Sequence, residues 1–147
     1  MLKENRKTDP LYLINYLHKL IDQDLDKRLS EYGLTSQQGR ILFFVSGKTR
    51  FEGIEVHQND IENEYHLSKS TVSGLVKRME KKGLITIEKQ HPYAILRPAD
   101  KGLEIIRHLV KHKDEVIDCL LKDINETDKA QLMQSLLIMI NNMEGEK

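Results

Sequence analysis

Apolar residues recur at intervals of three and four over most of the chain, which is the pattern of amphipathic helices. Asp9 and Pro10 are typical of a helix N-cap and a first helical position, and Ser68 is a good N-cap further along. Glycines mark several of the expected helix ends. The predicted helices run from Pro10 to Gly33, from after Thr35 to near Gly47, over 58–66, from Ser68 to Gly83, over 99–122 and over 128–142, and residues 47–53 are predicted to be a loop.

Two strand-like segments, Leu84–Lys89 and Tyr93–Arg97, flank a predicted turn of Gln90, His91 and Pro92. An isolated pair of strands is only marginally stable in water, so this hairpin must lean on the helices before it. Four helices, a hairpin and two further helices are the order of elements in a winged helix-turn-helix protein. The expected fold class is therefore mostly α with a small β-hairpin wing.

The fourth predicted helix lies within LSKSTVSGLVKRMEKKGLI, residues 67–85. Its apolar residues fall at i, i+3, i+4 and i+7 and form one stripe that should be buried, namely Val72, Leu75, Val76 and Met79. The opposite face carries Ser70, Ser73, Gly74, Lys77 and Lys81, with Thr71 and Arg78 at one flank. A glycine inside a helix costs about 1 kcal/mol relative to alanine. A slim face of this kind suits close approach to the major groove of DNA, which is about 12 Å wide.

The charge distribution supports this interpretation although the formal net charge of the chain is zero. From Lys69 to Arg97 there are seven Lys or Arg residues and two Glu residues, a local charge of +5. From Glu52 to Glu64 there are five acidic residues and no basic one. Taken alone, the fourth helix is equally compatible with an ordinary amphipathic helix whose polar face is solvated. The short helix before it and the hairpin after it favour DNA binding.

These segments resemble the multiple antibiotic resistance regulator (MarR) family of bacterial transcription regulators. LTSQQGRILFFV (34–45) resembles the second helix of the family, VHQNDIENEYHLSKSTVSGLVKRMEKKGLI (56–85) its helix-turn-helix, and DKG (100–102) the start of its long fifth helix. The resemblance implies a homodimer whose recognition helices enter successive major grooves of a pseudo-palindromic operator, with the wings reaching toward the adjacent minor grooves. By family habit it also implies repression. Positions that carry DNA contacts in the family correspond to Ser68, Lys69, Ser70, Thr71, Ser73 and Lys77.

The wing departs from the family pattern. The Asp-Arg-Arg run near the tip is absent, and Pro98-Ala99 replaces Leu-Thr. The usual arginine contact therefore cannot be transferred to this chain, and its cationic substitutes are Lys89, His91 and Arg97. With the helix positions, the full set of candidate DNA-binding residues is Ser68, Lys69, Ser70, Thr71, Ser73, Gly74, Lys77, Arg78, Lys81, Lys89, His91 and Arg97.

The last helix is apolar on almost every side, which predicts burial all round. A chain of this size has little core to cover it, so the sequence favours an intermolecular interface over a hairpin with the fifth helix. The predicted dimer residues are Leu11, Ile14, Leu17, Leu132, Leu136, Met139 and Ile140. The corresponding regions are 1–32 and 99–147 for dimerisation, with 33–98 as the winged helix-turn-helix lobe.

Family members often release DNA when a small molecule binds, and Tyr12, Tyr16, Phe43 and Phe44 are candidates for lining an effector pocket. Aromatic residues at helical spacing are more often simple core. His108 and His112 have a spacing that can bind a metal, but three nearby lysines favour a solvated face. Cys119 lies among apolar residues, and a buried cysteine is usually inert. We therefore expect no metal and no cofactor.

The chain shows no grouping typical of an enzyme, such as GxSxG, a phosphate loop or HExxH. One cysteine rules out an internal disulfide, and no apolar run is long enough to span a bilayer, so we expect a cytoplasmic protein that is not an enzyme. The rival to DNA binding is a winged-helix module that binds proteins. Such a module is expected to expose aromatic or aliphatic side chains where this chain has Ser, Gly and Lys.

Overall fold

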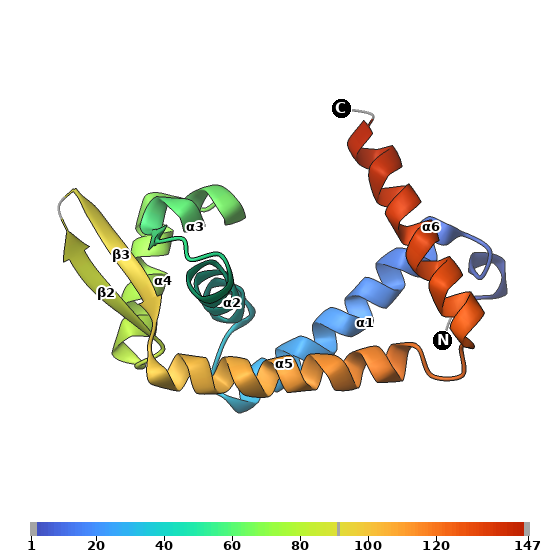
Figure 1. The fold of residues 1–147 in the computed structure, drawn as a ribbon, viewed down its shortest axis with the longest axis horizontal. Helices are drawn as coiled ribbons and strands as arrows, with labels where there is room; N and C mark the ends of the chain where they lie inside the picture. The colour runs from blue at the N-terminus through green and yellow to red at the C-terminus, as the bar shows by residue number, and fades with distance from the viewer. Residues whose placement is uncertain (1–2, 91, 146–147) are drawn as a thin grey trace. The chain divides into compact units, whose positions relative to one another are not determined.

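The computed structural model describes residues 3–90 and 92–145 and divides the chain into two compact units, 1–110 and 111–147. In chain order the elements are η1 (Glu4–Arg6), α1 (Pro10–Glu31), α2 (Ser36–Phe51), β1 (Val56–His57), α3 (Gln58–Tyr65), α4 (Lys69–Lys81), β2 (Ile85–Gln90), β3 (Tyr93–Pro98), α5 (Asp100–Leu120) and α6 (Glu126–Gly145), as Figure 1 shows. The expected class, mostly α with a small β wing, is confirmed. Among the described residues no helix is both long and apolar enough to cross a membrane.

Side chains at the helix starts explain where the first helices begin. The Asp9 carboxylate accepts hydrogen bonds from the backbone N–H groups of Leu11 and Tyr12, at 3.0 and 3.2 Å, with Pro10 as the first helical residue. Thr35 and Gln38 form a capping box at the start of α2, with each side chain bonded to the backbone of the other. These contacts satisfy amide groups that would otherwise have no partner inside the helix.

The hairpin is part of a three-stranded antiparallel sheet with the order β1-β3-β2. The β2–β3 register runs from Ile85 opposite Pro98 to Gln90 opposite Tyr93 at the tip. Strand β1 was not predicted, because two residues are too few to produce an alternating pattern. It pairs with Ile95 and Leu96 in the middle of β3, so this part of β3 has a partner strand on both sides.

The helices and the sheet of the first unit share one apolar core. The stripe predicted for α4 is fully buried, as expected. The core also draws on α1, α2, α3, the sheet and the first half of α5, through side chains that include Leu29, Leu42, Val45, Ile61, Leu84, Leu96, Ile106 and Leu109. Packing on several elements at once fixes α4 within this unit.

The largest differences from the predicted boundaries are in α2 and α6. The segment predicted as a loop after Gly47 is helical, and α2 continues to Phe51. Lys48 and Glu52 form an ion pair at 2.9 Å across this stretch, one helical turn apart, and the chain turns only at Gly53, where φ is +63°. The last helix runs from Glu126 to Gly145, so it begins two residues earlier and ends three residues later than predicted. A single glycine that is not followed by other turn-forming residues is a weak signal for a helix end, and α2 continues through Gly47.

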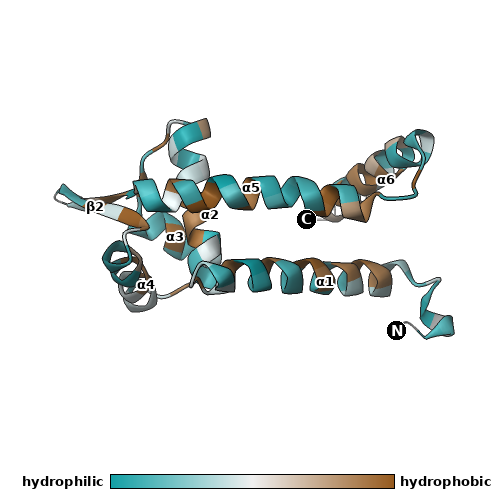
Figure 2. Ribbon diagram, turned by 90° about the horizontal axis from the view of Figure 1, so that it is seen from below, coloured by the Kyte–Doolittle hydropathy of each residue, from teal (hydrophilic) through white to brown (hydrophobic). Residues whose placement is uncertain are grey.

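Helix α6, in the second unit, has no buried side chain among its described residues. Its apolar residues are exposed in the single chain, and so are several at the start of α1, where Leu11 is 67% exposed. Figure 2 shows brown, apolar residues on both helices. The expectation that α6 is buried on every side is therefore not met within one chain.

Gly102 allows α5 to start directly against the end of the α4–β2 connection. A Cβ atom at this position would overlap the Leu84 carbonyl oxygen and would lie 3.0 Å from Leu42 Cδ1. The same Leu84 carbonyl accepts the backbone N–H of Ala99 at 2.9 Å. Only glycine fits this close approach between two backbone segments.

We predict that Gly102→Ala lowers the free energy of unfolding by about 1–3 kcal/mol, because the added methyl group meets backbone that cannot move aside. Gly47→Ala is the matched control, since Gly47 also lies in a helix but a methyl group added there would meet open space. It should raise stability by about 0.5–1 kcal/mol. Urea denaturation measures both, and equal effects of the two substitutions would contradict the close-approach explanation.

Candidate nucleic-acid interface

The turn between α3 and α4 is set by one residue in a left-handed conformation. His66 ends α3 with φ of +53°, and the Leu67 N–H then bonds back to the Glu62 carbonyl at 3.1 Å. The Gln58 side-chain amide donates to the Lys69 carbonyl at 3.3 Å, which joins the starts of the two helices. This sharp turn orients α4 with its apolar stripe inward and its opposite face toward solvent.

The outward face of α4 is narrow and basic. Ser70, Thr71, Lys77, Arg78 and Lys81 are exposed, and Ser73 and Gly74 are half-buried. A Cβ atom at residue 74 would lie 3.4 Å from Arg78 Nη1, so the Arg78 side chain runs along the helix and its guanidinium group lies over the glycine. The structure thus brings the predicted helix residues together on one surface.

The hydroxyl groups at the start of α4 differ in their hydrogen bonds. Ser68 Oγ accepts the Thr71 N–H at 3.2 Å and donates to Thr71 Oγ1 at 2.8 Å, so it serves as the N-cap. Ser70 Oγ lies 3.3 Å from Ser68 Oγ. The positive end of the helix dipole lies here, and hydroxyl and amide groups at such an end favour contact with an anion such as phosphate.

Lys82 belongs to the fold rather than to this surface. Its Nζ donates to the Gly33 carbonyl at 2.9 Å and lies 3.4 Å from Gln38 Oε1. Its own carbonyl accepts from Lys101 Nζ at 3.3 Å. The local charge counted from the sequence therefore includes one lysine that is directed at the backbone of the domain.

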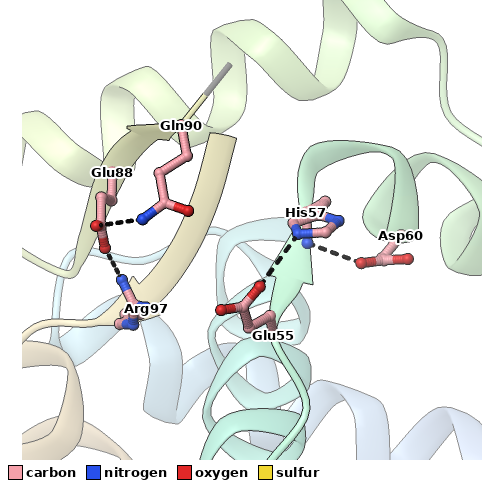
Figure 3. A network of polar contacts seen from close by, with 6 residues as sticks. All are labelled: Glu55, His57, Asp60, Glu88, Gln90 and Arg97. Atoms are coloured by element: carbon pink, nitrogen blue, oxygen red, sulfur yellow. Dashed lines mark hydrogen bonds and ion pairs between the residues drawn. The ribbon is translucent and has the colours of Figure 1, made fainter. Parts of the chain in front are cut away.

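Arg97 lies away from the wing tip and is paired. It is opposite Thr86, four residue pairs from the tip pair, which corresponds to about 13 Å along a strand. Figure 3 shows its guanidinium joined to the Glu88 carboxylate, which also accepts from Gln90 Nε2 at 2.8 Å. The hydrogen bond from Arg97, and then that from Gln90, holds the pKa of Glu88 below its ordinary value. Lys89 is exposed beside the tip, and His91 lies outside the described residues.

Comparison with known proteins agrees with this geometry. The MarR family model matches residues 32–91, which contain α2, α3, α4 and the wing up to its turn. Over these residues the chain is similar to the MarR family. The matched model is that of a family of transcription regulators rather than of enzymes, which is the kind of protein that the sequence predicts. No curated protein sequence is significantly similar to the chain.

Several MarR-type structures share the fold over nearly their whole length. MepR, a transcription regulator of the Staphylococcus aureus multidrug efflux pump MepA, has a TM-score of 0.78 at 21% identity over 91% of this chain and 98% of its own. A MarR family protein from Bacillus stearothermophilus also has a TM-score of 0.78, at 20% identity over 98% and 99%. The S. aureus MepR–DNA complex has a TM-score of 0.72 at 21% identity over 93% and 99%.

The four aromatic residues considered for a MarR-type effector pocket lie in two places. Tyr12 and Tyr16 stack on each other in α1 with ring centroids 6.1 Å apart. Phe44 packs edge-on against Tyr65 at 6.0 Å, and Phe43 packs against the core. Phe44 lines a cavity of about 530 Å³ between α2, β1 and α3, and the other three predicted residues do not. Burial raises the pKa of the Tyr65 hydroxyl, which donates to the Arg40 carbonyl at 3.0 Å.

His108, His112 and Cys119 do not form a shared site. His108 stacks on Tyr32 with centroids 6.1 Å apart, and His112 Nδ1 lies 3.5 Å from a Glu115 carboxylate oxygen. Within residues 3–90 and 92–145, no group of three His, Cys, Asp or Glu side chains is placed to hold a metal ion. Cys119 is exposed, so the expectation of a buried cysteine is wrong for the single chain.

We predict that Ser68→Ala lowers the free energy of unfolding by about 1 kcal/mol, because the Thr71 N–H loses its acceptor. Ser70→Ala is the control, since Ser70 makes no contact with a helix amide and alanine is the better helix former. Chemical denaturation followed by circular dichroism gives both values. A loss of the same size in both variants would show that Ser68 is not the cap.

Proposed function

We propose that the protein is a sequence-specific regulator of transcription that binds double-stranded DNA as a homodimer on a pseudo-palindromic operator, with repression as its mode of action. The observation that carries this proposal is α4, whose buried stripe fixes the helix while a slim face of Ser70, Ser73, Gly74 and Lys77 is left outward. A helix of this kind fits the major groove, where hydroxyl groups can reach base edges and lysines can contact phosphates.

The electrostatics of the outward face support DNA as the partner. Lys69, Lys77 and Lys81 are exposed and have no carboxylate partner among the described side chains. In the S. aureus MepR–DNA complex, a protein of the same fold is bound to DNA. A genome-binding regulator would act in the cytoplasm, which is the location we propose. A protein-interaction module is less well supported, because the outward face of α4 exposes no aromatic or aliphatic side chain.

Dimerisation is proposed from apolar surface that one chain leaves uncovered. On α1, Leu11, Ile14 and Leu17 are exposed, and on α6 so are Leu132, Leu136, Met139 and Ile140. Burying such side chains is favourable by roughly 25 cal/mol per Å² of apolar surface. We propose that residues 1–32 and 99–147 form the dimerisation region and that 33–98 form the DNA-binding lobe.

Release by a small-molecule effector is the last part of the proposal. The Tyr12–Tyr16 pair supports it, because these rings are half-buried on α1 next to Leu11 and Ile14, which the proposed dimer would cover. A lipophilic molecule bound beside these rings would lie at the edge of the proposed dimer interface. The direct test is to add such a molecule and measure DNA binding. The wild type should lose DNA binding, and the Tyr16→Ala variant should keep it.

The test of DNA binding uses a duplex that the wild-type protein selects from a random pool. We predict that Lys77→Gln weakens binding and reduces the slope of log K against log salt by about 0.9, because one phosphate contact is lost. Lys82→Gln is the matched control. Its Nζ contacts Gly33 and Gln38, so it should lower the free energy of unfolding by about 1 kcal/mol and leave the salt slope unchanged. Failure of the wild type to select any duplex at low salt would favour the protein-interaction module.

We predict that Leu136→Asp converts a dimer into a monomer, because a charge in an apolar interface is costly to bury. Gln134→Asp adds the same charge two residues away, on the opposite side of α6, and should leave the dimer intact. Size-exclusion chromatography with light scattering at low micromolar concentration measures the mass of each. A wild-type mass equal to that of one folded chain would rule out the proposed dimer.

A further inference from the structure

The outer end of the wing lacks the third strand that pairs with the middle of β3. Strand β1 pairs only with Ile95 and Leu96 of β3, so the last two residue pairs, Lys89 with Ala94 and Gln90 with Tyr93, form a ribbon of two strands. A two-stranded ribbon twists easily and is marginally stable in water. A contact outside the ladder would therefore help to hold this end of the wing in one direction.

A stacked pair of rings supplies such a contact. His57 of β1 lies directly opposite Ile95, and Tyr93 lies two residues before Ile95, toward the wing tip, on the same face of the sheet. Diagonal neighbours of this kind lie within reach of aromatic side chains. The rings of His57 and Tyr93 have centroids 5.0 Å apart and planes inclined by only 8°. Tyr93 is the first residue after the wing turn, so the stack acts at the tip.

His57 is itself held at the start of the helix-turn-helix. Its backbone N–H donates to the Asp60 carboxylate at 2.7 Å, as the N-cap residue of α3, and its Nε2 lies 3.7 Å from a Glu55 oxygen (Figure 3). The side chain is 28% exposed, whereas Tyr93 is 56% exposed. The imidazole ring thus connects the start of α3 with the two-stranded end of the wing.

We propose that His57 is a positioning residue for the wing, whose stack on Tyr93 fixes the tip relative to α3 and α4 and so sets the wing's share of DNA binding. This inference rests on the proposed DNA-binding function. The α4 helix enters the groove through its own face, and His57 contributes nothing to that contact. Its effect is confined to the DNA that flanks the recognition-helix sites.

A second set of side-chain contacts, which we call the Glu88 brace, links strand β2 of the wing to the base of β3. Gln90, the partner of Tyr93 across the turn, is tied to Glu88, and Glu88 is tied to Arg97 near the base. These side chains lie on the same face of the sheet as His57. Because this brace remains in a His57 variant, the ladder should stay formed and only the direction and mobility of the tip should change.

The experiment compares wild type, His57→Ala and His57→Phe in the full chain. Phenylalanine keeps a flat ring for the stack and removes the nitrogen atoms. With the duplex selected by wild type, His57→Ala should bind about two- to tenfold more weakly, the range expected for loss of one aromatic pair. Hydroxyl-radical protection should fall in the flanking minor grooves and persist under α4. His57→Phe should restore both affinity and protection.

A second measurement does not depend on DNA. Hydrogen exchange of the wing segment 86–96 should be faster in His57→Ala than in wild type and in His57→Phe, while exchange in α4 stays unchanged. Equal weakening in both variants, or unchanged flanking protection and exchange in His57→Ala, would overturn the proposal. If wild type binds no duplex, the proposed function fails, and the exchange data still decide whether His57 positions the wing.

Discussion

Burial of the apolar stripe of α4 is the constraint on which the functional surface depends. Val72, Val76 and Met79 are completely inaccessible to solvent or nearly so, and they contact a core built from α1, α2, α3, the sheet and the start of α5. A helix held along one whole side cannot rotate without exposing that side, at roughly 25 cal/mol per Å². The direction of its opposite face is therefore set by packing, before any ligand is present.

The composition of that opposite face follows from the same constraint. Once the stripe supplies the stability of α4, the outward positions need not be strong helix formers. Gly74 is tolerated at a cost of about 1 kcal/mol and leaves room for Arg78 to lie along the helix. The Ser68 cap and the left-handed turn at His66 fix where the helix begins. Stability and recognition are thus assigned to different sides of one short helix.

The sequence predicts the elements with strong periodic or capping signals. The α4 stripe, the Asp9 and Ser68 caps and the hairpin were found in this way. The end of α2 was missed because Gly47 resembles a terminator, while the contacts that extend the helix, such as Lys48 with Glu52, depend on geometry. Strand β1 was missed because its evidence is its pairing with β3. The partners of Lys82 and Arg97 lie far along the chain or across strands, so residue type alone suggested cations available to a ligand.

These partners explain how a chain with zero net charge can present a basic surface. Several acidic residues are used locally, since Asp60 binds the His57 backbone, Glu52 pairs with Lys48 and Glu88 pairs with Arg97. Among the described residues, no cation of α4 forms an ion pair of this kind, so the acids that pair elsewhere do not cancel their charge. At physiological salt the screening length is about 8 Å, and charges beyond it contribute little to a contact. The local arrangement of charges, and not their sum, therefore determines what α4 attracts.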